Sequence, residues 1–350
     1  MKITFLLAGV TSFPAGGFKV IFEYANRLAG DGHVVNIVMG AATVSPKITV
    51  AAFFRFPYYK LRNKYSPEKW FQLHPDIRCF YHFTLFEHNL PESDIVIATA
   101  VETAFYLKKY KRKVKKFYFI QDFEAWAISE RKVYETYAFP FTKIVIAPWL
   151  KQKVESVGEK AVVVPNGFDF DYFKLYKPIE KRNKLQILMM YHKMERKRCV
   201  DSIAALQIVK KKYPQLEIKM FGKPERPKNL SFDFEYYQSP DKETHNQLYN
   251  EAAIYIAASS VEGWGLTIGE AMICGCAVAC TDNDGFKIMA HDNETALLSP
   301  AYDYNKLAEN IIRLIEDDEL RIGLAKKANE SIQQYTWDNS YKKFKEIILN

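Results

Sequence analysis

Long apolar runs are missing from this sequence. Its 350 residues contain no stretch of about 18 uncharged apolar residues, the length that a membrane-spanning helix needs. The opening segment, Met1–Gly9, is too short for a secretory signal peptide, and its apolar residues are better suited to a first strand. We therefore expect a protein of the cytoplasm that has no spanning helix.

Cysteine is also scarce. The five cysteines include no CxxC pair, so the sequence shows neither a disulfide framework nor the usual zinc-binding spacing. Cys274 and Cys276 lie in an apolar segment, where buried packing is favoured over a metal site. This usage suits a reducing cytoplasm, and we expect no bound metal and no cofactor.

Acidic residues are few in the first half of the chain. Residues 1–168 contain 23 Lys and Arg against 14 Asp and Glu, a difference of +9. The whole chain has 49 against 41, or +8, so residues 169–350 have 26 against 27, or −1. A basic first half favours an anionic partner, which is a membrane surface, an anionic acceptor or nucleic acid.

Length and periodicity predict two α/β domains. A chain of 350 residues is too long for one ordinary core, and both halves alternate apolar strand-like runs with helical patterns. The first glycine loop is not G-x-G-x-x-G, so a dinucleotide site is not predicted. The main expected strands are residues 3–7, 32–38, 94–98, 117–120, 143–147, 185–191, 216–221, 234–237, 254–260 and 277–280, and the main expected helices are 18–28, 199–212 and 266–274.

The segment Glu262–Glu270 stands between an apolar strand, 254–260, and a helix of small residues, 266–274. Open α/β sheets bind ligands at this position, beyond the carboxyl end of a strand. The free N–H groups and the dipole of the following helix favour a phosphate. Glu270 has two interpretations, because Thr267-x-x-Glu270 is also a capping box, in which Glu270 serves the helix alone.

Two glutamates eight positions apart, with Gly-Trp-Gly-Leu between them, resemble the signature of retaining nucleotide-sugar glycosyltransferases of the GT-B fold, family 4 (group 1). The resemblance implies two Rossmann-like domains facing across a cleft. It implies transfer from a nucleoside-diphosphate sugar with retention at the anomeric carbon. Glu262 is then the acid that contacts the donor sugar, and Glu270 binds the ribose hydroxyls. The loop amides between them hold the diphosphate.

The same family places an arginine near residue 191 or 192 and a Lys-Gly pair just after it, both on the diphosphate. Lys197 fits the lysine, but Tyr191-His192 replaces the arginine and Arg198 replaces the glycine. Arg196 or Arg198 is then left to substitute for the arginine. The alternative is that this loop is merely basic and solvated.

In the first half, the loop with Gly16-Gly17 precedes a helix and either faces the donor phosphates or is a plain turn. Gln121-Asp-Phe-Glu124 follows a strand at a position where many family members have histidine. It resembles a branch that makes rhamnose-containing and other bacterial cell-surface polysaccharides. Asp122 or Glu124 orients the acceptor, or Asp122 caps the next helix, which we favour.

The resemblance gives a set of site residues. The candidates for catalysis are Glu262, Lys197 and Asp122, and the candidates for donor binding are Gly16, Gly17, Gly222, Gly263, Trp264, Gly265, Leu266, Thr267, Glu270 and Arg196. No metal is expected, because Asp169-x-Asp171 lies in a turn whose chemistry Asn166-Gly167 explains.

Residues 53–71 interleave aromatic and basic side chains, and residues 108–116 form a dense basic run. Such segments lie at a lipid headgroup boundary, bind single-stranded nucleic acid by stacking, or simply form a surface. We favour an anionic membrane surface over nucleic acid, and expect a peripheral protein on the inner face of the plasma membrane.

We expect an acceptor-side domain at 1–173, a linker at 174–184, a nucleotide-sugar-binding domain at 185–335 and a helix at 336–350 that crosses back to the first domain. The predicted function is transfer of a hexosyl or deoxyhexosyl group to a glycan or lipid-linked acceptor in cell-surface polysaccharide synthesis. The alternative is a non-catalytic GT-B partner subunit that binds an enzyme or glycan.

Overall fold

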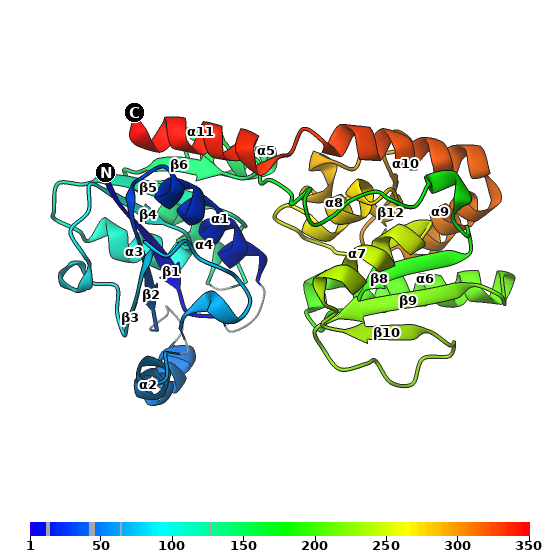
Figure 1. The fold of residues 1–350 in the computed structure, drawn as a ribbon, viewed down its shortest axis with the longest axis horizontal. Helices are drawn as coiled ribbons and strands as arrows, with labels where there is room; N and C mark the ends of the chain where they lie inside the picture. Colours follow the sequence, from blue (N-terminus) through cyan, green and yellow to red (C-terminus); the bar gives the residue numbers. More distant parts are fainter. Residues whose placement is uncertain (12–14, 42–45, 64, 127) are drawn as a thin grey trace. The chain divides into compact units, whose positions relative to one another are not determined.

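The structure, a computed structural model, describes residues 1–11, 15–41, 46–63, 65–126 and 128–350. The chain divides into two compact units, Met1–Asn166 with Trp337–Asn350, and Gly167–Thr336. Each unit is a parallel sheet flanked by helices (Figure 1). Two Rossmann-like α/β domains, as predicted, are therefore present.

The first unit has a seven-stranded sheet in the order β3-β2-β1-β4-β5-β6-β7, and every neighbouring pair is parallel. Its strands are β1 (Lys2–Ala8), β2 (Val34–Gly40), β3 (Arg78–His82), β4 (Ile95–Ala98), β5 (Lys115–Ile120), β6 (Thr142–Val145) and β7 (Ala161–Val163). Its helices are α1 (Gly16–Gly30), α2 (Pro46–Leu61), α3 (Val101–Lys108), α4 (Glu130–Tyr137), α5 (Pro148–Glu155) and α11 (Trp337–Leu349).

The strand order of this sheet reverses direction between β1 and β4. Because crossovers between parallel strands are right-handed, α1 after β1 and α3 after β4 cover opposite faces. The central strands are buried on both faces, which explains their nearly continuous apolar sequences.

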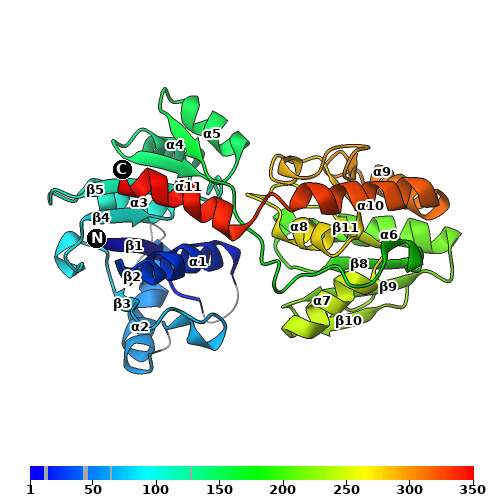
Figure 2. The ribbon, with the colours of Figure 1, turned by 45° about the horizontal axis from the view of Figure 1, so that its top comes forward.

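Helix α11 brings the end of the chain back onto the first unit, where it lies beside α1 (Figure 2). Its Phe344 is fully buried. The Phe344 ring stacks on Tyr24 at a centroid distance of 4.2 Å and also contacts Phe5 and Phe119, at 6.4 and 5.6 Å. The last turns of the chain therefore complete the core of the unit that contains its first strand.

The second unit has a six-stranded parallel sheet in the order β10-β9-β8-β11-β12-β13. Its strands are β8 (Gln186–Met190), β9 (Glu217–Gly222), β10 (Glu235–Gln238), β11 (Ile254–Ala257), β12 (Ala277–Thr281) and β13 (Leu297–Ser299). Its helices are α6 (Cys199–Lys212), α7 (Lys242–Glu251), α8 (Leu266–Ile273), α9 (Tyr304–Glu316) and α10 (Asp318–Ile332). The strand order reverses between β8 and β11.

The segment predicted as a linker, 174–184, lies in the second unit. Its Arg182 is buried, and its guanidinium donates hydrogen bonds to the carbonyl oxygens of Tyr249, Ala252 and Cys274. A buried charge that is satisfied by carbonyl oxygens fixes this segment to α7 and to the residues just before β11 and β12.

The cysteines of the second unit are buried, including Cys274 and Cys276. The Cys276 thiol lies 3.0 Å from the carbonyl oxygen of Tyr249, and burial raises its pKa to about 11. The packing interpretation of this pair is confirmed.

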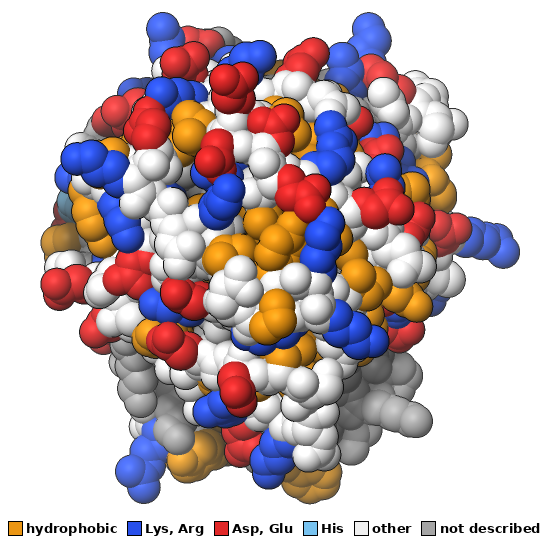
Figure 3. Space-filling model, turned by 90° about the vertical axis from the view of Figure 1, so that its right-hand side faces the viewer, with side chains coloured by type: hydrophobic (Ala, Val, Ile, Leu, Met, Phe, Trp, Pro, Cys, Tyr) orange, Lys and Arg blue, Asp and Glu red, His pale blue; other side chains and the backbone are white. Residues whose placement is uncertain are grey.

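Within the described residues, none of the helices has both the length and the hydrophobicity of a membrane span. On the face of the second unit that Figure 3 shows, acidic and basic side chains are interspersed, in keeping with the near balance of charge in residues 169–350. The aromatic and basic segment 53–71 includes the end of α2, where Phe54 and Leu61 are 76% and 85% exposed.

Replacement of Phe344 by Ala should destabilise the first unit by about 3–5 kcal/mol, because it opens a cavity between three aromatic rings. Urea unfolding, followed by circular dichroism, measures this loss. Lys342→Ala on the exposed side of the same helix is the matched control and should change stability little. Equal unfolding midpoints for the two variants would show that α11 is not part of this core.

Candidate functional site

The candidate site lies at the switch point of the second unit, where the loops after β8 and β11 leave neighbouring strands in opposite directions. The first loop contains the short 3-10 helix Glu195–Lys197. The second loop is tied to it, because Ser260 N donates to the carbonyl oxygen of Arg196 at 2.8 Å. Topology therefore brings Lys197 and Glu262 together although 65 positions separate them.

Lys197 and Glu262 form an ion pair with 2.6 Å between Nζ and Oε1. Their side chains are 17% and 10% exposed, and Ser259 Oγ donates to the same oxygen at 2.7 Å. Within the described part of the chain, no hydrogen bond engages the second oxygen, Oε2. Glu262 is thus a fixed carboxylate that retains one oxygen for a ligand.

Helix α8 begins just beyond this pair. Its N-cap is Gly265, which has φ +89° and provides no side-chain cap. The first N–H groups of the helix therefore stay available for an anion. Thr267 lies inside the helix, so the capping-box interpretation of Thr267 and Glu270 is wrong. A side chain at position 265 would also collide with Phe286.

The loop around Glu262 rests on residues 281–286. Asn283 Nδ2 donates to the carbonyl oxygen of Ser259 at 2.9 Å, while its Oδ1 accepts from Gly285 N and Phe286 N, both at 3.1 Å. A Cβ atom at Gly285 would overlap the carbonyl group of Glu262. Glycine is required here because the two backbones approach so closely.

Glu270 projects from the second turn of α8 toward α7. Tyr249, which is fully buried, places its hydroxyl 3.0 Å from Glu270 Oε2 and 3.3 Å from the carbonyl oxygen of Thr267. Tyr249 therefore holds the carboxylate in place. The indole of Trp264 is itself buried and packs against Tyr335 with ring centroids 5.4 Å apart, so this side chain is part of the core.

Arg198 does not take the place of the missing arginine. Its guanidinium pairs with Asp201 through two contacts, Nε to Oδ2 at 2.7 Å and Nη2 to Oδ1 at 2.9 Å. Its backbone has φ +45°, in the left-handed region that glycine adopts most easily. Arg198 thus adopts a backbone conformation that suits the glycine expected here from the family resemblance.

His192 lies at the same site. Its Nδ1 accepts from Met194 N at 2.9 Å, which leaves the ring proton on Nε2. Burial lowers the pKa of His192, and the charges of Lys197 and Arg196 lower it further. At neutral pH the ring is therefore uncharged and offers an N–H donor.

Gly222 ends β9 beside this loop. A Cβ atom there would overlap the carbonyl oxygen of Tyr191. The backbone N–H of Tyr191 donates to the carbonyl oxygen of Phe221 at 2.7 Å. The glycine thus lets the loop after β8 pass close to β9. In the structure its contribution to the site is steric.

In the first unit, Gly16 and Gly17 form the exposed start of α1, and the N-cap Ala15 provides no side-chain cap. Gln121 Nε2 donates to the carbonyl oxygen of Gly17 at 3.1 Å. The residue that replaces the expected histidine therefore joins the loop after β5 to the first turn of α1.

Asp122 does not cap the next helix, and that prediction is wrong. Helix α4 begins at Glu130 with Ser129 as its N-cap, while Asp122 Oδ1 accepts from the adjacent Phe123 N at 2.9 Å. Glu124 instead serves α3, because its Oε2 accepts from Val101 N at 2.5 Å. The sequence does not predict this contact, because Glu124 lies in a loop well after α3, whereas capping residues are normally sought just before a helix.

Asp169-x-Asp171 lies in a turn, as expected, but the turn comprises residues 170–172 and Asn166-Gly167 lies outside it. Asp169 Oδ1 accepts from Tyr172 N at 3.1 Å, and Asp171 pairs with Lys174 at 3.9 Å. Across the residues that the structure describes, no group of three or more His, Cys, Asp or Glu side chains is placed to hold a metal.

Sequence reasoning missed four residues of the site: Tyr249, Ser259, Asn283 and His192 as a neutral donor. Ser259 could have been found, because it lies three positions before Glu262 on the same loop. Tyr249 and Asn283 come from other elements, so no local spacing connects them to the site.

Residues 173–331 match the family described as glycosyl transferases group 1. A phosphatidyl-myo-inositol mannosyltransferase from Mycolicibacterium smegmatis is 27% identical over 195 residues, which cover 53% of this chain and 50% of that protein. A poly(glycerol-phosphate) alpha-glucosyltransferase from Bacillus subtilis is 25% identical over 156 residues, or 41% of this chain and 22% of that protein. The chain thus matches half or less of the length of each relative.

Solved structures resemble the chain over nearly all of its length. Sucrose-phosphate synthase from Thermosynechococcus elongatus has a TM-score of 0.76 at 16% identity, covering 98% of both chains. Anabaena Alr3699/HepE, solved in complex with UDP and glucose, has a TM-score of 0.73 at 16% identity, covering 99% of both. The predicted GT-B fold is confirmed.

Glu124 should make the stability of the first unit depend on pH. Burial raises its pKa from the usual 4.5 to about 8, and the charges of Glu102 and Asp122 act in the same direction. The folded state therefore binds more protons than the unfolded state between these values. The contribution of Glu124 to the free energy of unfolding is therefore fully present below pH 4.5 and is lost as pH rises toward 8.

Urea unfolding at several pH values between 5 and 8 measures this effect. Glu124→Gln keeps an acceptor for Val101 N but cannot ionise, so its free energy of unfolding should fall less steeply with pH. Glu130→Gln, exposed on α4, is the control. Parallel slopes for wild type and Glu124→Gln would contradict the assignment.

Proposed function

We propose that this chain is a retaining glycosyltransferase of family 4, which transfers a hexosyl or deoxyhexosyl group from a nucleoside-diphosphate sugar to a glycan or lipid-linked acceptor. One observation carries the proposal. The Lys197–Glu262 pair and the uncapped start of α8 meet at the switch point of the second unit, where open α/β sheets bind nucleotides.

The diphosphate would be held without a metal ion. The N–H groups at the start of α8 point out of the helix and carry its positive dipole. Lys197 supplies a full positive charge beside them, and neutral His192 supplies a further N–H. Together they would stabilise the negative charge that develops on the leaving diphosphate.

Glu262 would hold the donor sugar. Lys197 and Ser259 both contact its Oε1, so Oε2 remains for a sugar hydroxyl. Glu270, fixed by Tyr249, would accept from the ribose hydroxyls, in keeping with the family resemblance. Gly263 and Gly265 would let the loop backbone approach the phosphates closely.

The comparisons support this proposal. The group 1 glycosyltransferase match, 173–331, contains every candidate of the second unit. One structural neighbour was solved with UDP and glucose. Two relatives are named for transfer to phosphatidyl-myo-inositol and to poly(glycerol-phosphate), which supports a lipid-linked or polymeric acceptor and a role in cell-surface polysaccharide synthesis.

A second function, binding without catalysis, draws support from one contact. Arg198 is bound to Asp201, so it adds no charge to the phosphate site. Weak binding of the donor suits a partner subunit that binds an enzyme or glycan. A transferase would turn over donor and acceptor, whereas a partner subunit would only bind them.

Substitution at the two glutamates tests the proposal. Glu262→Gln should lower release of UDP from UDP-sugars by about 10²-fold or more, because the acid that holds the sugar is lost. Glu270→Gln should mainly weaken UDP binding, measured by calorimetry. Ser231→Ala, on the exposed surface of the second unit, is the control.

Stability must be checked in the same samples, because removing one partner of a buried ion pair costs about 3–5 kcal/mol. Thermal unfolding of Lys197→Met/Glu262→Gln, which removes both charges, separates folding from chemistry. Wild-type protein that binds no nucleoside diphosphate would refute the donor site. Binding without turnover in any donor and acceptor mixture would favour the partner subunit.

Transfer should survive removal of divalent metal, since Lys197 and the helix N–H groups would replace the metal at the diphosphate. The measurement is the turnover rate in EDTA, with Mg²⁺ or Mn²⁺ added back. Rates should agree within about twofold. Complete loss in EDTA and recovery with metal would contradict the proposed site.

The first unit would bind an anionic membrane surface through the end of α2, which exposes aromatic side chains beside bases. Lys60 lies 5.6 Å from the Phe56 ring, and Lys60 and Arg62 are exposed. Of the other bases predicted for this contact, Lys64 lies outside the described residues, and the side chain of Arg55 is not described. In the basic run 108–116, Arg112 forms an ion pair with Glu87 of the same unit.

Sedimentation with anionic vesicles tests this surface. Wild-type protein should bind at low salt and dissociate as salt rises. Lys60→Gln/Arg62→Gln should weaken binding by up to about 1 kcal/mol for each base. Lys342→Gln/Lys343→Gln, exposed on α11, controls for net charge. Equal losses for both pairs would mean that α2 has no special role.

A further inference from the structure

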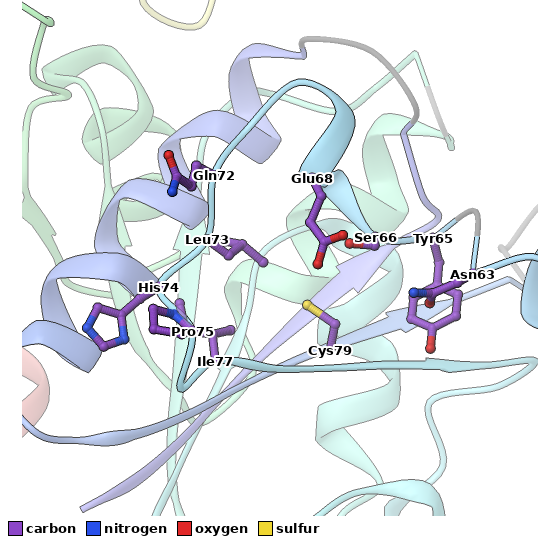
Figure 4. A pocket seen from close by; sticks show the side chains of 10 residues that line it. All are labelled: Asn63, Tyr65, Ser66, Glu68, Gln72, Leu73, His74, Pro75, Ile77 and Cys79. Atoms are coloured by element: carbon purple, nitrogen blue, oxygen red, sulfur yellow. The ribbon is translucent and has the colours of Figure 1, made fainter.

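A pocket of about 410 Å³ lies in the first unit, beside the edge strand β3. Cys79, the second residue of β3, is one of its lining residues, whereas the ligand edge of the sheet lies at the other end of that strand. The pocket is therefore separate from the start of α1 and from Asp122. It is lined by Asn63, Tyr65, Ser66, Glu68, Gln72, Leu73, His74, Pro75, Ile77 and Cys79 (Figure 4).

The walls of this pocket are built into the fold. Asn26 on α1 fixes one wall, because its Nδ2 donates to Gln72 O at 2.9 Å and its Oδ1 accepts from His74 N at 2.8 Å. On another side, the ring of Tyr65 stacks on Tyr81 of β3 with centroids 5.5 Å apart. These contacts hold the lining segments in place without a ligand.

The polar groups of the described lining are amides, hydroxyls, one imidazole, one thiol and one carboxylate. The side chains of Asn63, Ser66 and Gln72 have no hydrogen-bond partner within the described part of the chain, so they keep both donors and acceptors for a ligand. Glu68 is the carboxylate of the lining, and it faces the thiol of Cys79 (Figure 4). Its charge raises the pKa of that thiol, after burial as the main cause.

The Glu68 carboxylate disfavours one class of ligand. The described lining contains no Lys and no Arg, although this half of the chain is strongly basic. A phosphate or another anion would be repelled by the Glu68 carboxylate. The pocket therefore differs from the phosphate-binding site proposed for the second unit.

The remaining chemistry matches a sugar ring. A pyranose presents hydroxyls that both donate and accept, around faces that are partly apolar. Amides, a hydroxyl and a carboxylate can bind those hydroxyls, while Leu73, Ile77 and the ring of Tyr65 can pack against the apolar faces. The volume lies in the range of about 300–1,000 Å³ that is usual for ligand pockets.

We propose that this pocket is a glycan-binding subsite that takes a neutral sugar residue, away from the site of transfer. It goes beyond the proposed transfer reaction, since it needs neither the nucleotide nor the second unit. In a transferase it would hold a polymeric acceptor at a distance from the reacting end.

The pocket contains its own reporter. Cys79 is partly accessible, whereas the other four cysteines are buried. A neutral alkylating reagent should therefore modify Cys79 first, slowly at pH 8 because the pKa of the thiol is about 11. Mass spectrometry of the modified peptide then measures whether a ligand covers the pocket.

The probes are the methyl glycosides of glucose, mannose and N-acetylglucosamine, in concentration series without nucleotide. At least one should slow alkylation of Cys79 several-fold, and saturation-transfer NMR should show contact with the same glycoside. Inorganic phosphate should give no protection. Addition of UDP should not change the result, which separates this subsite from the donor site.

Glu68→Gln tests the carboxylate. It should reduce protection by the glycoside several-fold, although alkylation without ligand becomes faster as the pKa of Cys79 falls. Glu346→Gln, exposed on α11, should leave both rates unchanged. Protection by tetramethylammonium alone would assign the pocket to cations and overturn the proposal. Absence of protection and of NMR contact for all three glycosides would also overturn it.

Discussion

The ion pair between Lys197 and Glu262 organises the candidate site. It joins the loops that leave β8 and β11 at the one point where the strand order of the second unit reverses. Two nearly buried charges are stable there because each compensates the other. A diphosphate would compete with Glu262 for Lys197. Without a ligand, the carboxylate of Glu262 neutralises the charge of Lys197.

The surroundings of the pair restrict which residues this stretch of the chain can contain. Gly265 takes a left-handed backbone so that α8 can begin with free N–H groups, and Gly285 leaves room for the carbonyl group of Glu262. Asn283 and Tyr249, from two other elements, hold Ser259 and Glu270. These hydrogen bonds hold the loop and the carboxylate in place before any ligand binds, which would lower the entropy lost on binding.

The fold could be predicted from the sequence because buried parallel strands are apolar throughout, as in β4 and β11, and their helices are periodic, as in α1. The carboxylate was identifiable because it lies on a loop directly after a strand, and the lysine because it matches the family resemblance. Long-range contacts were not. Glu124 caps a helix that precedes it, Arg182 fixes a segment that resembles a linker, and Arg198 pairs with Asp201. These interactions depend on partners that only the folded chain brings together.

The central claim is that the start of α8 and the loop with Lys197 receive the diphosphate of the donor. Amide hydrogen exchange with and without UDP, followed by mass spectrometry, tests it directly, because a bound phosphate should protect the N–H groups that it accepts from. The account predicts slower exchange in peptides that cover 262–268 and 194–199. Slower exchange confined to other segments, at a UDP concentration that saturates the protein, would contradict it.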